Sequence, residues 1–170
     1  DQAVPGVLFK VWDGWFVGDS VALRLQDDGE TLLPLDAGTA RFVTVRGAAP
    51  GASPWAVGGR GSAVAGRWEG QTFAAVDAST FPAALNGVWV EPDGVAWAAG
   101  MAGGLGAWDG QVWEHPDPAP TQDDLHAVLR HGDDLLFLGG DLFAQDGGHG
   151  SLVVYGGAPP QTSVEACDAP

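Results

Sequence analysis

Histidines and aspartates gather in the last third of the chain, and both residue types can bind metal ions. Three of the four histidines, His126, His131 and His149, fall between residues 123 and 149, together with six aspartates. Histidine beside carboxylates can ligate a transition metal, whereas carboxylates beside backbone carbonyls can hold calcium. The segment 141–148 (DLFAQDGG) has the second composition, so calcium bound through Asp141 and Asp146 is the first metal site to consider. Solvated acidic loops remain the preferred interpretation because EF-hand spacing is absent, and no other cofactor is indicated.

A second set of polar residues is expected to line a channel. Four segments open with the pattern Leu/Phe-x-x-Val, at 8–11, 42–45, 85–88 and 125–128, and polar side chains recur in or just after them. A ring of such groups could hold an ion, a small ligand or a cluster of water molecules, and water is the preferred interpretation. Two of the groups, a lysine and an arginine, could form a basic spot near the channel. The candidate channel residues are Lys10, Thr44, Arg46, Asn86 and His126.

Catalytic chemistry has little support in the sequence. No Gly-x-Ser-x-Gly motif is present, and the single cysteine, Cys167, lies in a polar tail. A glycosidase would need two facing carboxylates, and the sequence does not pair them. A sialidase-like site would need clustered arginines, but Arg46 alone lies near a predicted channel strand. We therefore assign no catalytic residue and favour a protein that is not an enzyme.

These residues sit in a repeat of about forty residues. Each copy contains the opening strand, a second strand with an aromatic residue ahead of glycine, and, in three copies, a third strand that leads into a turn. The four aromatic residues are spaced 40, 42 and 40 positions apart: Trp15, Trp55, Trp97 and Phe137. A repeat of this length built from strands and turns is typical of a β-propeller blade. At such repeated positions, tryptophans are expected to pack between blades rather than to bind ligand.

Turn signals set the boundaries within the repeat. Asp-Gly or Glu-Gly pairs occur at 28–29, 69–70 and 109–110, where glycine can reach the positive φ of a tight hairpin. Asp13 and Gly14 alone separate the first two strands of the first copy, so that hairpin must be very short. No convincing helix is predicted. The expected organisation is an N-terminal tail (1–7), a propeller domain (8–157) with blades at 8–41, 42–84, 85–124 and 125–157, and a C-terminal tail (158–170).

The third copy carries a resemblance to a known group of proteins. Leu85-Asn86-Gly87-Val88-Trp89, Val95-Ala96-Trp97-Ala98-Ala99-Gly100 and Trp108-Asp109-Gly110-Gln111-Val112-Trp113 resemble the repeats of uncharacterised propeller-like proteins of myxobacteria and related bacteria. The resemblance extends over residues 8–157 and is weakest in the fourth copy. It implies a propeller fold and an exported location (periplasmic, outer surface or extracellular). Because that group has no agreed activity, the resemblance implies no catalytic residues.

The composition of the chain narrows the range of possible binding partners. The 170-residue chain has 22 acidic and 7 basic side chains, giving a net charge of −15, which disfavours nucleic acid and anionic membranes. No run of eighteen apolar residues exists, so membrane insertion is not expected. One cysteine excludes an internal disulfide. Since the chain begins at Asp1 without a signal peptide, either a leader has been removed or the chain is part of a longer protein.

The sequence therefore predicts an all-β protein, a small propeller of four antiparallel blades. A closed four-bladed ring is the first expectation, two chains forming an eight-bladed ring the second, and a fragment of a larger propeller the third. The expected function is a binding or scaffold domain that presents loops to a protein or glycan partner. The alternatives are a glycan-acting hydrolase or lyase with a site at the channel mouth, and a structural subunit of an envelope or shell assembly.

Overall fold

The computed structural model describes residues 6–37, 40–141 and 148–156, and within these ranges the chain forms fifteen β-strands and no helix. The all-β prediction is confirmed. The strands are β1 (Leu8–Trp12), β2 (Trp15–Gly18), β3 (Val21–Leu25), β4 (Leu32–Leu35), β5 (Phe42–Arg46), β6 (Trp55–Gly59), β7 (Ala63–Trp68), β8 (Phe73–Val76), β9 (Leu85–Val90), β10 (Ala96–Gly100), β11 (Leu105–Trp108), β12 (Trp113–Glu114), β13 (Leu125–His131), β14 (Asp134–Gly140) and β15 (Gly150–Tyr155).

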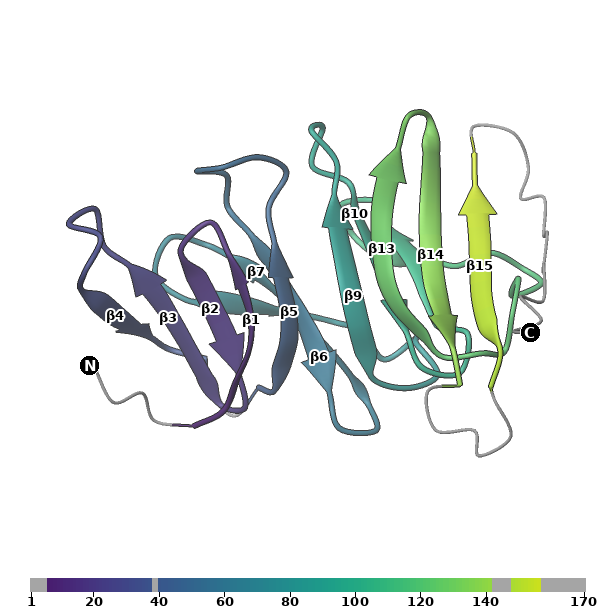
Figure 1. The fold of residues 1–170 in the computed structure, drawn as a ribbon, viewed down its shortest axis with the longest axis horizontal. Coiled ribbons are helices and arrows are strands. Elements are labelled where there is room, and N and C mark those ends of the chain that lie inside the picture. Colours follow the sequence, from purple (N-terminus) through teal and green to yellow (C-terminus); the bar gives the residue numbers. More distant parts are fainter. Residues whose placement is uncertain (1–5, 38–39, 142–147, 157–170) are drawn as a thin grey trace.

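Consecutive strands pair antiparallel into four separate sheets (Figure 1). Sheet 1 contains β1–β4, sheet 2 contains β5–β8, sheet 3 contains β9–β12, and sheet 4 contains β13–β15. In each sheet the strands follow one another in chain order, and each strand pairs with the next one along the chain. The first strands of successive sheets (β1, β5, β9 and β13) lie side by side.

The predicted tight turns are present. Asp13 and Gly14 have φ values of 43° and 74°, the two positive angles that a two-residue hairpin between β1 and β2 requires. Between β11 and β12, Gly110 has φ 109°, and Asp109 Oδ1 accepts hydrogen bonds from the backbone N–H groups of Gln111 (2.7 Å) and Val112 (2.8 Å). These side-chain bonds hold the turn closed and keep the pKa of Asp109 below its ordinary value.

Glycine occurs near the end of the second strand of each repeat for a steric reason. Every first strand contains a β-bulge, at Phe9, Val43, Asn86 and His126, and the bulge brings the backbone of the first strand against that glycine. A Cβ at Gly58 would lie 2.0 Å from the carbonyl oxygen of Arg41, and one at Gly139 would lie 1.9 Å from that of Asp124. No side chain fits such a gap, so the repeat requires glycine there.

The fourth repeat departs from the predicted alignment by one residue. Trp97 pairs across the sheet with Trp89, and the matching pair in sheet 4 is Leu136 with Leu129. Phe137 therefore does not occupy the position of Trp15, Trp55 and Trp97. Because alternate residues of a strand point to opposite faces, the shift turns Phe137 toward sheet 3, where it is fully buried.

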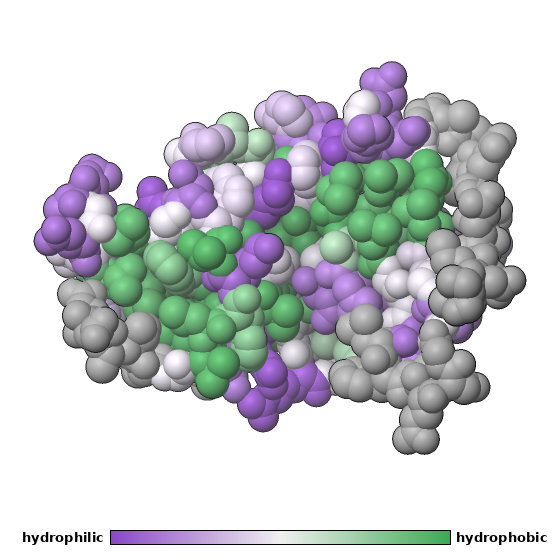
Figure 2. Space-filling view, viewed as in Figure 1, coloured by the Kyte–Doolittle hydropathy of each residue, from purple (hydrophilic) through white to green (hydrophobic). Residues whose placement is uncertain are grey.

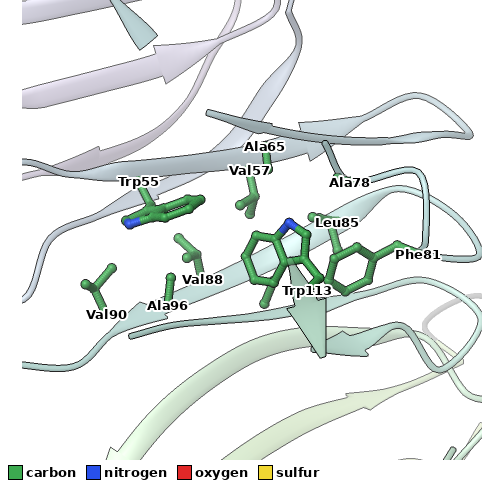
Figure 3. Close-up of a cluster of buried hydrophobic side chains, with 11 residues drawn as sticks. Trp55, Val57, Ala65, Ala78, Phe81, Leu85, Val88, Val90, Ala96 and Trp113 are labelled. Carbon is green, nitrogen blue, oxygen red and sulfur yellow. The ribbon is translucent and has the colours of Figure 1, made fainter. Parts of the chain in front are cut away.

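Hydrophobic side chains fill the spaces between successive sheets. One cluster joins sheets 1 and 2 around Trp15 and Phe42, and another joins sheets 3 and 4 around Leu125 and Phe137. Figure 3 shows the cluster between sheets 2 and 3, where Trp55 lies among aliphatic side chains and Trp113 packs edge-on against Phe81 at 5.2 Å between ring centres. The predicted packing role of the tryptophans is confirmed, since all eight are buried or partly buried in or beside the sheets.

The four sheets form an open row. Packing between strands connects sheet 1 to 2, 2 to 3 and 3 to 4, whereas sheets 1 and 4 stand at opposite ends of the molecule (Figure 1). The structure therefore does not confirm the closed four-bladed ring that the sequence predicts first. In the part of the chain that the structure describes, no helix is long and apolar enough to span a membrane.

Candidate functional site

A cavity of about 140 Å³ lies along the first strands of the sheets, and we call it the inner cavity. All five candidate channel residues from the sequence line it: Lys10 on β1, Thr44 and Arg46 on β5, Asn86 on β9 and His126 on β13. Trp12 and small or aliphatic residues of the same strands complete its wall. The repeat thus brings together five polar residues that are up to 116 positions apart in the chain.

Arg46 is the most constrained basic group of the inner cavity. Its guanidinium carbon lies 3.8 Å from the centre of the Trp89 ring, a cation–π contact between sheets 2 and 3. The Nε atom is buried and has no hydrogen-bond partner in the described structure. Burial lowers the pKa of Arg46, but an arginine keeps its proton in proteins, so the cavity wall carries a fixed positive charge.

Asn86 and His126 are the bulge residues of β9 and β13, and both are tied to backbone carbonyls. The Nδ2 of Asn86 donates to the carbonyl oxygen of Leu125 at 3.0 Å, which joins sheet 3 to sheet 4. The Nε2 of His126 lies 3.1 Å from the carbonyl oxygen of Gly140 and must carry hydrogen to donate to it. These bonds fix the orientation of both side chains at the cavity.

The charge of the inner cavity is opposite to that of the chain. The protein has 22 acidic side chains and 7 lysines and arginines, yet the residues that line the cavity include Lys10 and Arg46, together with His126, and no aspartate or glutamate. Thr44 and Asn86 add neutral hydrogen-bonding groups. Cationic and hydrogen-bonding groups around one small space form an environment that favours an anionic group such as a carboxylate or phosphate.

A larger cavity, of about 410 Å³, lies between the segment that follows β4 and the strands of sheet 2. Apart from Asp36 and Thr72 its wall is apolar, formed by side chains such as Phe42 and Phe73 that belong to the packing between sheets 1 and 2. None of the candidate site residues from the sequence lines it. We therefore take the smaller, polar inner cavity as the candidate site.

The predicted metal site is only partly within the described structure. Asp141 is described, but Asp146 lies outside the described residues, so calcium binding there stays a prediction. The histidines that the sequence grouped with these aspartates are separated by the fold. His126 lies at the inner cavity, whereas His149 Nε2 lies 3.2 Å from Asp123 Oδ2. Among residues 6–37, 40–141 and 148–156, no three His, Cys, Asp or Glu side chains gather as a metal site would require.

The sequence did not predict that Trp89 contributes to this site. The tryptophan was expected only to pack between blades, but its ring also carries the guanidinium of Arg46. The two residues are 43 positions apart and belong to different repeats, so no local pattern links them. An arginine two positions after the channel residue Thr44 was the only available signal.

Comparison with known proteins gives no family: no protein-family model matches the chain, and no curated protein matches it. The resemblance to myxobacterial propeller-like repeats therefore stays an expectation from the sequence.

Proposed function

We propose that this chain is a non-enzymatic binding domain of the β-propeller type, in which the inner cavity takes an anionic group of a glycan or protein partner. In this account the four sheets are propeller blades and their first strands line the channel side. The partner class that fits best is a carboxylated glycan, because a polymer can place one carboxylate in the cavity and extend past it over the neighbouring surface.

One observation carries the proposal: in a chain of net charge −15, the wall of the inner cavity has two basic residues, Lys10 and Arg46, beside His126, and no acidic residue. Arg46 cannot neutralise itself by losing a proton, and Trp89 holds its guanidinium in place. An anion that enters would meet a preorganised positive charge and the donors of Thr44 and Lys10.

The volume of the cavity limits what enters it. At about 140 Å³ it is smaller than the 300–1,000 Å³ that is usual for sites enclosing a whole small molecule. It has room for one carboxylate or phosphate group, or for about four water molecules at roughly 30 Å³ each. The main affinity of a glycan would therefore come from the surface beside the cavity, with the anion setting its specificity.

A glycan-acting hydrolase or lyase is less well supported. Glycoside hydrolysis generally needs two carboxyl groups at the scissile bond. The wall of the inner cavity supplies none. A structural subunit remains an alternative, and it would use other surfaces than this cavity. An exported location, which the resemblance implies, would bring a binding domain to extracellular or envelope polymers.

Calorimetric titration tests the proposal. We expect a galacturonic-acid oligosaccharide to bind and the neutral maltose oligomer of equal length to bind at least ten times more weakly. Arg46→Met should weaken the acidic ligand about tenfold, since loss of one close charge contact is worth about 1.4 kcal/mol. Arg67→Met, an exposed arginine away from the cavity, is the control. Equal binding of both oligosaccharides would contradict the proposal.

A further inference from the structure

The two ends of the row of sheets expose side chains that the repeat buries everywhere else. Each sheet has a forward face, toward the next sheet in the chain, and a backward face, toward the preceding one. On the forward face, the residue before the repeat glycine is Val17, Val57 or Ala99 in the first three sheets, and each is 0% exposed. Leu138 holds this position in sheet 4 and is 40% exposed.

The neighbouring position on the third strand repeats this contrast. Ala22, Ala65 and Leu105 pair across the sheet with Val17, Val57 and Ala99, and are 1%, 3% and 3% exposed. In sheet 4 the partner of Leu138 is Leu152, which is 39% exposed. The cross-strand rows therefore place aliphatic residues on all three strands of this face: Ala127, Leu129, Leu136, Leu138, Leu152 and Val154.

The backward face of sheet 1 shows the complementary contrast. The valine that closes the opening motif is 1% exposed at Val45, 5% at Val88 and 8% at Val128, because each packs on the preceding sheet. Val11 holds the same position in sheet 1 and is 53% exposed. Phe16, beside it on β2, is partly exposed although its counterpart Phe137 is fully buried.

Both end faces look toward the same side of the molecule. In the view of Figures 1 and 2, hydrophobic surface gathers over β1–β3 at one end and over β13–β15 at the other, with hydrophilic surface between them. The cross-strand rows of the two faces, through Val11 and Phe16 and through Leu138 and Leu152, contain no charged residue. One partner of the right shape could therefore cover both faces at once.

We propose that this partner is a second copy of the chain. The forward face of sheet 4 in each copy packs on the backward face of sheet 1 in the other, as sheets 1–2, 2–3 and 3–4 pack within the chain. A two-fold axis makes both contacts together and closes a ring of eight sheets. The contact continues a type of interface that the chain already uses three times, which is why the occupant is another sheet of this repeat.

The two proposed contacts between sheet 4 of one copy and sheet 1 of the other differ from the contacts between sheets within one chain. The difference lies in which face carries the larger side chains. Leu136 stands where the first three sheets have tryptophan, and Phe16 stands where sheets 2 and 3 have Ala56 and Ala98. A smaller residue on the forward face thus meets a larger one on the backward face. Phe137 occupies the same repeat position as Phe16 and is fully buried against sheet 3, so the interface accepts an aromatic ring there.

Light scattering coupled to size exclusion tests this proposal on the full chain. The expected mass is twice the 17.4 kDa of one chain. Leu138→Glu and Val11→Glu should each raise the dimer dissociation constant at least about 100-fold, because each puts an unpaired charge into both joints of the ring. Val112→Glu is the matched control, since Val112 is 57% exposed in the turn before β12 and belongs to neither face.

The two variants distinguish the arrangement. A dimer made through sheet 4 of both copies would respond to Leu138→Glu but not to Val11→Glu, and that result would overturn the head-to-tail ring. A monomeric native chain, or a dimer that resists both substitutions, would overturn it as well; the first outcome would point to sheets of another chain as the occupant. Circular dichroism should show unchanged folding of both variants, since both positions are exposed in the single chain. The proposal does not depend on the anion site.

Discussion

The guanidinium carbon of Arg46 lies 3.8 Å from the centre of the Trp89 ring, and the buried Nε of this arginine has no hydrogen-bond partner in the described structure. The contact joins the end of β5 to β9 beside the inner cavity. A partly buried arginine is usually accompanied by a carboxylate, but an aromatic ring takes that place beside Arg46. The charge of Arg46 is therefore held in place without being neutralised, which is the property that a site for an anion needs.

The first prediction concerns this contact. Trp89→Leu should lower the free energy of unfolding by about 1–2 kcal/mol through loss of the cation–π interaction, with a further loss of packing. Trp89→Phe keeps a ring and should cost less. In a double-mutant cycle measured by urea unfolding, Arg46→Met should remove about 1 kcal/mol of the Trp89→Leu effect. Strict additivity of the two substitutions would show that the contact contributes nothing.

The second prediction concerns the joint between sheets 3 and 4. Asn86→Ala removes the side-chain bond to the carbonyl oxygen of Leu125, so it should destabilise the protein by about 1 kcal/mol. Urea unfolding measures the change. Gln71→Ala, at an exposed turn position, is the control and should stay within about 0.5 kcal/mol of the native chain. An Asn86→Ala protein as stable as this control would contradict the assigned bond.

The third prediction tests the steric origin of the repeat glycine. Gly58→Ala places a Cβ 2.0 Å from the carbonyl oxygen of Arg41 and should destabilise the protein by more than about 3 kcal/mol. Gly150→Ala is the matched control, because the nearest atom to its Cβ would be the carbonyl oxygen of Gly139 at 3.9 Å. Thermal unfolding of the two variants gives the comparison. Similar melting temperatures would show that the bulge opens easily.

The fourth prediction concerns Asp123. The hydroxyl of Ser151 donates to this carboxylate and, with a smaller effect of His149, holds its pKa below the ordinary value of 3.8. Because this pKa is lower in the folded than in the unfolded state, the ionised carboxylate stabilises the fold at pH values above its unfolded-state pKa. That contribution is lost as the pH falls through its folded-state pKa. Ser151→Ala should therefore raise the pKa of Asp123 in an NMR titration. An unchanged pKa would mean that the hydroxyl bond has no part in the shift.

Much of the fold could be predicted because glycines, tryptophans and turn residues recur at fixed positions of the repeat. Asp13-Gly14 gave the shortest hairpin, and the spacing of Trp15, Trp55 and Trp97 placed the second strands. The fourth copy was misaligned by one residue because Phe137 and Leu136 are both plausible core residues. The spacing to the repeat glycine reveals the difference, because the tryptophans of the first three copies stand three residues before it, whereas Phe137 stands two residues before Gly139.

The open arrangement could not be predicted for a different reason. Repeat length fixes the size of each sheet, but the angle between neighbouring sheets depends on how side chains such as Trp55 and Trp113 fill the space between them. Four units therefore suit either a closed ring or an arc. The candidate site was easier, since all its predicted residues lie at one place in the repeat. Its basic character was also anticipated from Lys10 and Arg46, whereas the contact of Arg46 with Trp89 was not, because the two residues come from different repeats.

The most direct test of the proposed function follows the Nε–H resonance of Arg46 by NMR during a titration with a galacturonic-acid oligosaccharide. The account predicts a saturable shift of this resonance, accompanied by the side-chain resonances of Lys10 and His126, and no shift with the neutral maltose oligomer. Raised salt should weaken the effect, because the attraction is electrostatic. If the acidic oligosaccharide leaves the Arg46 resonance unchanged, or if both oligosaccharides shift it alike, the inner cavity is not a site for anionic groups.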